Sequence, residues 1–152
     1  MPKPPPSGVT APCKSPGMTI PTLEELVDAI AASWSRETSF ASEEFMSRGA
    51  SGNPSRGQCG PTSLVVQDWF GGSLLVTDVF IAGASVGAHY WNRLPDSREV
   101  DLTRRQFLPD ETLGEAMVTP RVPKQEPAKG LEQYRLLQSR VRDLVGEPRQ
   151  LA

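Results

Sequence analysis

The sequence predicts an α+β domain in which helices pack on a small antiparallel sheet. Helical spacing of apolar residues begins at residue 23 and returns at residue 131, and β-rich stretches separated by turns occupy residues 73–103. The 152 residues suffice for one domain with a modest core, which we expect over residues 21–147. Residues 1–20 carry a proline cluster and predict a disordered tail.

A capping box predicts where the first helix begins. Thr22 followed by Glu25 forms a capping box, in which each side chain bonds the other residue's backbone N–H. Apolar residues then follow at helical spacing and predict one inward-facing side: Leu23, Leu26, Val27, Ile30 and Trp34. We expect this helix to end near Ser35 and a polar connection to follow.

A second helix carries a cysteine at its start. Pro61 fits only the first turn of a helix, and Gly71-Gly72 is a typical helix stop. Cys59 is therefore expected just ahead of the helix, where free N–H groups and the helix dipole favour an anion. A thiol in that position is biased toward the nucleophilic thiolate.

Three strands and a last helix complete the expected fold. The β-rich stretches are residues 73–82, 86–94 and 99–103, which predicts an antiparallel meander. Residues 104–129 show weak periodicity and are broken by prolines. An amphipathic pattern over residues 131–145, stopped by Gly146, predicts a helix that docks on the domain.

Cys59, His89 and Asp101 have the order that a thiol hydrolase needs. The cysteine would supply the nucleophile, the histidine would accept and return a proton, and the acid would fix the imidazole tautomer. Because side chains alternate along a strand, a two-residue turn would place the histidine and the acid on opposite faces. A three-residue turn, or a bulge, would place them on the same side, so the triad hypothesis requires one of these.

Three further residues are candidates for oxyanion or substrate binding. Gln58 could donate its amide to an oxyanion, with the Cys59 backbone N–H as second donor. Trp91 shares the face of His89, as core, as pocket wall, or as a shield over the imidazole–carboxylate bond. Asn92 is an alternative orienting residue but faces the other side by strand alternation.

The motifs resemble those of the YunG-like family of small bacterial proteins. The resemblance rests on Gln58-Cys59, on residues 68–72, on His89-Tyr90-Trp91-Asn92-Arg93-Leu94 and on residues 101–107, and it spans about residues 20 to 145. More distantly, the order of Cys, His-x-Trp and Val-Asp-Leu-Thr is similar to that of transglutaminase-like and papain-like thiol enzymes. That similarity implies a papain-like core in which a helix-borne cysteine faces a sheet with His and Asp.

Together these patterns favour a cysteine-dependent acyl-transfer enzyme. It would act on a small-molecule or peptide amide or thioester through a thioester intermediate, as an amidase, deamidase, peptidase or acyltransferase. The alternatives are a catalytically inactive domain that binds a small molecule or peptide, and a redox sensor that uses Cys59 alone.

Composition restricts the partners. A net charge of −2 with mixed signs argues against a nucleic-acid partner, and no apolar run is long enough for a membrane span. One histidine and one well-placed cysteine fall short of a metal site, so we expect no metal and no cofactor. Two cysteines, Cys13 in the tail and Cys59, make no disulfide framework, so a reduced cytoplasmic setting is expected.

Overall fold

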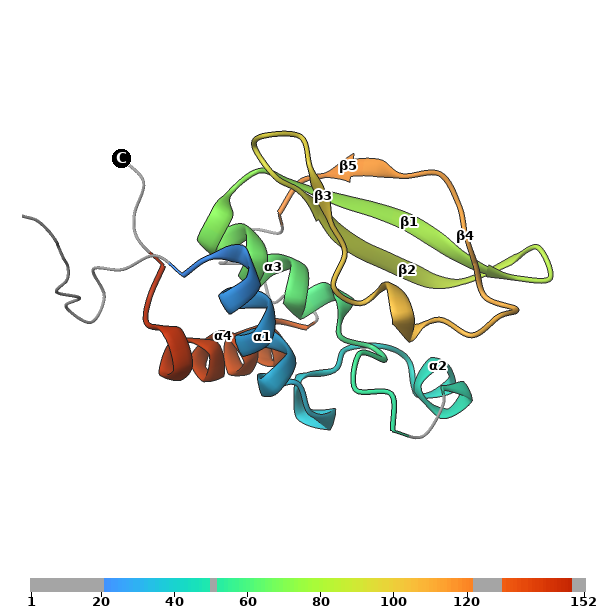
Figure 1. The fold of residues 1–152 in the computed structure, drawn as a ribbon. Helices are drawn as coiled ribbons and strands as arrows, with labels where there is room; N and C mark the ends of the chain where they lie inside the picture. Colours follow the sequence, from blue (N-terminus) through green and yellow to red (C-terminus); the bar gives the residue numbers. More distant parts are fainter. Residues whose placement is uncertain (1–20, 50–51, 122–129, 149–152) are drawn as a thin grey trace, which may run out of the picture.

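A computed structural model describes residues 21–49, 52–121 and 130–148. The predicted tail over residues 1–20, with Cys13, lies outside the described residues. Three helices gather at one end of the molecule and a sheet extends from them at the other (Figure 1). The elements are α1 (Leu23–Ser33), α2 (Glu43–Arg48), α3 (Cys59–Phe70), β1 (Ser73–Ile81), β2 (Ala84–Arg93), β3 (Glu99–Val100), β4 (Thr112–Leu113), β5 (Met117–Thr119) and α4 (Leu131–Val145), with short 3-10 turns at Arg36–Thr38 (η2) and Arg104–Gln106 (η3).

The predicted capping box at the start of α1 is confirmed. The Thr22 hydroxyl accepts from the Glu25 N–H at 3.0 Å, and the Glu25 carboxylate accepts from the Thr22 N–H at 2.9 Å. The helix ends at Ser33, two residues before the predicted end, because Trp34 is extended. The Trp34 indole N–H instead donates to the Thr62 hydroxyl at 2.9 Å, so the end of α1 is tied to the first turns of α3.

Helix α3 takes in the cysteine as its first residue, where the sequence suggested a position just ahead of it. Gln58 is the N-cap residue, and Pro61 lies in the first turn as predicted. Gly71 and Gly72 end the helix with φ of 73° and 83°. A Cβ at Gly72 would lie 2.2 Å from the Arg93 carbonyl oxygen, so the chain can cross from α3 into the sheet only with glycine there.

The sheet is antiparallel, with strand order β3-β2-β1-β4 and with β5 also paired to β1. The long β1–β2 hairpin confirms the first two predicted strands. The third strand, expected over residues 99–103, has only two residues, because the chain leaves the sheet at Asp101. Strands β4 and β5 were not predicted, because strands of two and three residues are too short to show an alternating pattern in the sequence.

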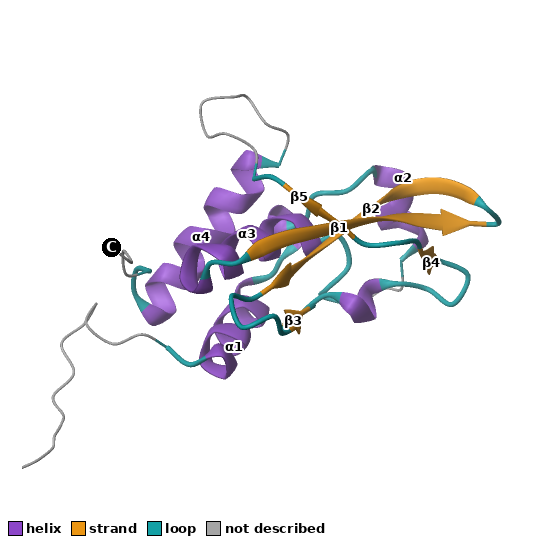
Figure 2. Ribbon diagram, turned by 90° about the horizontal axis from the view of Figure 1, so that it is seen from above, coloured by secondary structure: helices purple, strands orange, loops and turns teal. Residues whose placement is uncertain are grey.

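The apolar core lies where α1, α3 and α4 meet, beside the end of β2. Its buried members are Leu26, Ala29, Ile30, Val65, Val66, Trp69, Leu94, Tyr134, Leu137 and Val141. Seen from above, α4 lies alongside α3 (Figure 2), which confirms that the last helix docks on the domain. Each fully buried Leu or Val here contributes about 1.5–3 kcal/mol of transfer free energy.

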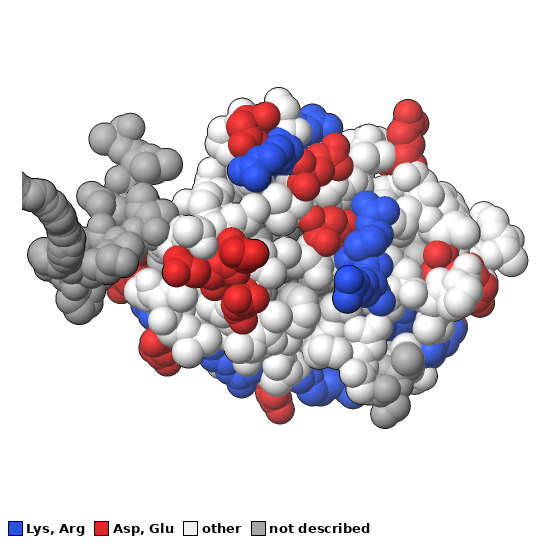
Figure 3. All heavy atoms as spheres, viewed as in Figure 1, with Lys and Arg blue, Asp and Glu red and all other residues white. Residues whose placement is uncertain are grey.

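Surface charge is mixed on the face drawn in Figure 3, where acidic and basic side chains are interspersed. Across residues 21–49, 52–121 and 130–148, none of the helices is long and apolar enough to cross a bilayer.

Candidate active site

Cys59 begins α3 and lies against β2. Its thiol donates to the carbonyl of Ala88, the residue before His89, at 3.9 Å, and the thiol is one of the groups whose proximity shifts the pKa of the imidazole. One helical turn later the Ser63 carbonyl accepts a hydrogen bond from the Asn92 amide at 2.9 Å. The helix therefore meets the strand at two levels, and the first of them brings the thiol to the histidine.

His89 and Asp101 form a direct hydrogen bond. Nε2 of His89 lies 2.7 Å from Oδ2 of Asp101, and the histidine is fully buried. The turn that brings the acid back has three residues, 95–97, since the Leu94 N–H donates to the Arg98 carbonyl at 2.7 Å. This is the odd turn that the triad hypothesis required, and Ser97 takes the left-handed conformation (φ 77°) that such turns use.

The surroundings of this pair shift the pKa values of both groups, upward for His89 and downward for Asp101. Burial opposes the imidazolium, yet hydrogen bonds to Asp101 and to the Cys59 thiol raise the pKa of His89 above 6.5. Burial would likewise raise the pKa of Asp101, but the hydrogen bonds and charges of His89 and Arg104 lower it. Arg104 Nε lies 2.7 Å from the same Oδ2 atom that His89 contacts.

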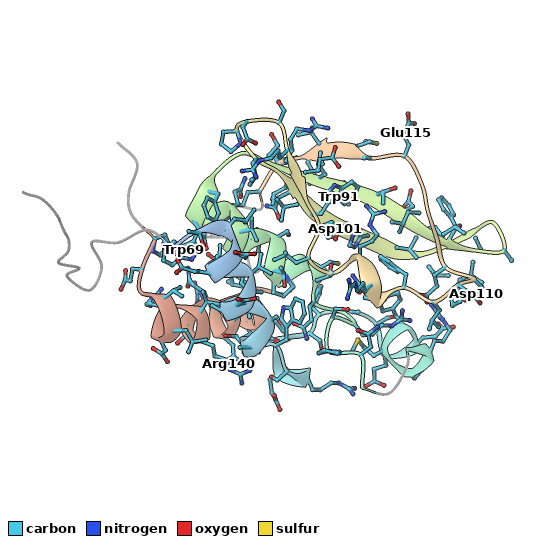
Figure 4. The ribbon with its side chains drawn as sticks, in the orientation of Figure 1. Trp69, Trp91, Asp101, Asp110, Glu115 and Arg140 are labelled. Atoms are coloured by element: carbon cyan, nitrogen blue, oxygen red, sulfur yellow. The ribbon has the colours of Figure 1, made fainter. Side chains whose placement is uncertain are left out.

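Aromatic side chains enclose the imidazole. Trp91 stacks on His89 with ring centroids 5.3 Å apart and an angle of 18°, and Phe107 meets the ring edge-on at 4.8 Å. The Trp91 indole N–H donates to Glu99 at 2.9 Å. Figure 4 places Trp91 and Asp101 close together beside β3. Trp91 thus lies on the histidine's face, as strand alternation predicted, and forms a wall of the imidazole site.

Two predicted residues have their polar groups turned elsewhere. The Gln58 amide is buried, donating to the Ser35 carbonyl at 2.9 Å and accepting from the Thr38 hydroxyl at 2.8 Å. Asn92 is buried in its bond to Ser63 and lies on the other face of β2. The expectation that Gln58 points its amide at an oxyanion is therefore corrected: both residues join segments of the fold around the cysteine.

Gln106 is a residue of the site that sequence reasoning missed. Its side chain is buried and bonds three partners: Oε1 accepts from the Gly57 N–H at 2.9 Å, and Nε2 lies 3.1 Å from the Thr103 hydroxyl and 3.3 Å from Nδ1 of His89. It joins the loop before the cysteine to the histidine. Its place in the stretch 101–107, which carried the family resemblance, was the available signal.

A buried ion pair holds Gln106 in place, and it was also missed. The Arg56 guanidinium binds both carboxylate oxygens of Glu111, at 2.6 and 2.9 Å, and donates to the Gln106 carbonyl at 2.9 Å. It also donates to the Phe45 carbonyl and lies over the Phe45 ring. Burial opposes ionisation of Glu111, but its bonds to Arg56 lower its pKa to about 2.

Access to the sulfur is narrow. Cys59 is only 7% exposed, whereas Ala88 beside it is exposed and Tyr90 and Gly60 are half-buried. A Cβ added to Gly60 would meet nothing within 4 Å, so space is open at the first turn of α3. The thiol therefore lies by the Ala88 carbonyl and near the imidazole, and the open space is beside the next residue, Gly60. A separate cleft of about 330 Å³ reaches Gln58 and Arg56, but neither Cys59 nor His89 lines it.

Metal ligands do not gather here. Within the part of the chain that the structure describes, no three His, Cys, Asp or Glu side chains come together as a metal ion would require.

Comparison with protein families assigns the chain. The model of the YunG protein family matches residues 22–146, which includes every residue of the site described above. The chain belongs to the YunG family. The YunG match covers all the described elements from α1 to α4. Comparisons with curated proteins and with solved structures gave no significant match.

Proposed function

We propose that this YunG protein is a cysteine-dependent acyl-transfer enzyme with Cys59 as nucleophile, His89 as general base and Asp101 as the residue that orients the imidazole. The single observation that carries the proposal is the His89–Asp101 bond of 2.7 Å, made by a buried ring on the strand against which the Cys59 thiol lies, at the Ala88 carbonyl. A buried imidazole between a carboxylate and a thiol is the arrangement that thiol enzymes use to create a nucleophile.

The proposed reaction begins with a proton transfer. Nε2 of His89 is bonded to Asp101, so Nδ1 is the ring nitrogen that accepts the Cys59 proton. The resulting thiolate attacks the carbonyl carbon of an amide or thioester, and the carbonyl electron pair moves to oxygen. The imidazolium returns its proton to the leaving amine or thiol, which leaves a thioester on Cys59 that water or an amine resolves.

The oxyanion would be held by backbone groups. The first N–H groups of a helix have no intrahelical partner, and Cys59 and Gly60 provide two of them beside open space. These donors replace Gln58, whose amide is bonded elsewhere.

A papain-like core is part of the same proposal. Support comes from the order of the elements: a helix that begins with the cysteine is followed by an antiparallel sheet that bears the histidine, with the acid after the next turn. The YunG chain is short, and the narrow approach to the sulfur favours a substrate that presents a slender amide or thioester group.

A reactivity profile of Cys59 tests the proposal. A Cys13→Ser background leaves one cysteine, and its alkylation by iodoacetamide is followed against pH. We expect alkylation well below pH 8.5, where a free thiol reacts, and loss of this reactivity in His89→Ala. Thr112→Ala is the control, since it removes an exposed hydrogen bond of the same sheet and touches neither the imidazole nor α3. An ordinary thiol profile that His89→Ala leaves unchanged would exclude the enzyme.

One observation favours a second candidate, a non-catalytic binding domain. Cys59 and His89 are both buried and the adjoining polar side chains are mutually bonded, which also suits a structural polar cluster. In that case, Cys59 would alkylate slowly at every pH below 8.5, in the native protein as in His89→Ala.

A further inference from the structure

Gln106 offers a buried amide whose orientation is fixed by its surroundings. Its Oε1 accepts from the backbone N–H of Gly57, a group that can only donate. Gly57 is buried and its carbonyl accepts from the Phe40 N–H at 2.8 Å, so its peptide is held in place and its own N–H needs Oε1 as a partner. The other end of the amide, the NH2 group, must therefore point at Thr103 and His89.

This orientation decides which nitrogen of His89 carries the proton. The Gln106 NH2 donates toward Nδ1 at 3.3 Å, so Nδ1 presents its lone pair, and Nε2 carries the hydrogen that Asp101 accepts. A protonated Nδ1 would place two donors face to face. Asp101 favours the charged ring from one side, and Gln106 opposes it from the other.

From this geometry we propose that Gln106 is a positioning residue that holds His89 as the neutral Nε2–H tautomer, so that Cys59 and His89 rest as thiol and imidazole rather than as a thiolate–imidazolium pair. This inference deepens the proposed function and rests on it for its catalytic meaning. Proton transfer from Cys59 to Nδ1 then requires the Gln106 contact to lengthen, which makes Gln106 a restraint on the charge of the nucleophile.

The groups around the ring are few. Cys59 faces it from α3, Asp101 with Arg104 faces it from the segment after β3, and Trp91 and Phe107 cover it with uncharged surface. Among the described residues the ring therefore has one carboxylate, one thiol and one amide as its polar neighbours.

The chain has one histidine, so ring NMR signals from histidine report on His89 alone. We expect ¹⁵N shifts of the neutral ring to show a protonated Nε2 and an unprotonated Nδ1. Gln106→Glu replaces the opposing donor with an acceptor, while its other oxygen can still accept from Gly57. The midpoint of the His89 titration should then rise by about one unit or more. Alkylation of Cys59 should extend to correspondingly lower pH.

Two further variants make the test decisive. Ser139→Glu adds the same charge at an exposed position of α4 and should leave the midpoint unchanged. Gln106→Met removes the donor without adding charge and should raise the His89 midpoint by a smaller amount. This variant provides the test if Gln106→Glu does not fold. A neutral ring protonated at Nδ1, or a midpoint that neither Gln106 variant raises, would overturn the inference.

Failure of the two proposals can be distinguished. The NMR titration of His89 does not depend on the reactivity of Cys59. If the His89 midpoint rises in Gln106→Glu but Cys59 is inert, the role of Gln106 is supported and the proposed enzymatic function is rejected. If Cys59 reactivity depends on His89 but neither Gln106 variant changes the His89 midpoint, the role of Gln106 is rejected and the proposed enzymatic function stands.

Discussion

Asp101 contacts His89 at 2.7 Å although no strand pairing joins the two residues. The last paired residue is Val100, opposite Asn92, and the chain leaves the sheet directly after it. Asp101 can therefore turn its carboxylate back across the strand end to the imidazole, where a regular strand would have carried it along the sheet. The same carboxylate also bonds the Thr103 N–H at 3.3 Å, which stabilises this departure.

Asp101→Asn should lower the pKa of His89. The carboxylate stabilises the imidazolium by its hydrogen bond and its charge, and an amide supplies neither to the same degree. We expect the midpoint to fall by about one unit, measured by NMR of the single histidine ring.

Arg104→Ala should act in the opposite direction. The guanidinium binds the same Asp101 Oδ2 atom as His89, so it neutralises part of the carboxylate charge that stabilises the imidazolium. Removing it should raise the His89 midpoint. Equal shifts of the same sign in both variants would contradict this account of the pair.

Glu111→Gln should destabilise the fold strongly at neutral pH. It leaves the buried Arg56 guanidinium without its counter-charge, which costs about 3–5 kcal/mol in typical buried pairs. Chemical denaturation at pH 7 measures the loss. Glu44→Gln is the control, because Glu44 is exposed and lies 3.7 Å from Arg48, and it should change stability by less than about 1 kcal/mol.

The cost of Glu111→Gln should also depend on pH. The folded pKa is lowered from 4.5 to about 2, so the stabilisation is present above pH 4.5 and is lost as pH falls toward 2. The difference between the native protein and Glu111→Gln should therefore shrink by roughly half between pH 7 and pH 3. A difference that stays constant over this range would show that the Glu111 charge is not what stabilises this region.

Gly72→Ala should prevent the close approach of α3 to the end of β2. Gly72 combines φ of 83° with a contact of only 2.2 Å between the added Cβ and the Arg93 carbonyl. Gly83 has the same φ but meets nothing within 4 Å, so Gly83→Ala should cost only about 1 kcal/mol of conformational strain. Thermal unfolding of the two variants should show a much larger loss for Gly72→Ala, and equal losses would contradict the steric explanation.

Asn92→Ala should weaken the contact between β2 and α3 without abolishing the His89–Asp101 bond. It removes the buried hydrogen bond to the Ser63 carbonyl, with an expected loss of about 1–3 kcal/mol. Urea unfolding measures this loss. Thr112→Ala, which removes an exposed bond of 3.4 Å to Phe80, should cost less than about 0.5 kcal/mol. A fall in the His89 midpoint as large as that in Asp101→Asn would contradict a purely packing role.

Local signals in the sequence predicted much of this fold. The helix start and stop signals act on the neighbouring backbone, so they can be interpreted without knowledge of the rest of the chain. They are Thr22 with Glu25, Pro61, and Gly71-Gly72. Strand alternation left the length of the turn at 95–97 open and showed only that the triad hypothesis required an odd turn or a bulge, a condition that the three-residue turn meets.

Side chains that act over long sequence distances could not be predicted. Gln106 reaches Gly57 across 49 positions, and Arg56 reaches Glu111 across 55. Nothing in local periodicity distinguishes such buried polar residues from solvated ones. Gln58 was misjudged for the same reason: its neighbour is the cysteine, but its partners are Ser35 and Thr38.

The polar region around Arg56 has a further consequence for how the molecule opens. The aliphatic core belongs to α1, α3 and α4, whereas α2, the loop before Cys59 and the segment 101–111 meet largely through Arg56, Gln106 and aromatic rings. Local unfolding should therefore release this region before the helices separate. Amide hydrogen exchange would then show fast exchange at Gly57 beside protected amides in α4, and the proposed nucleophile would sit on the boundary between two units of unequal stability.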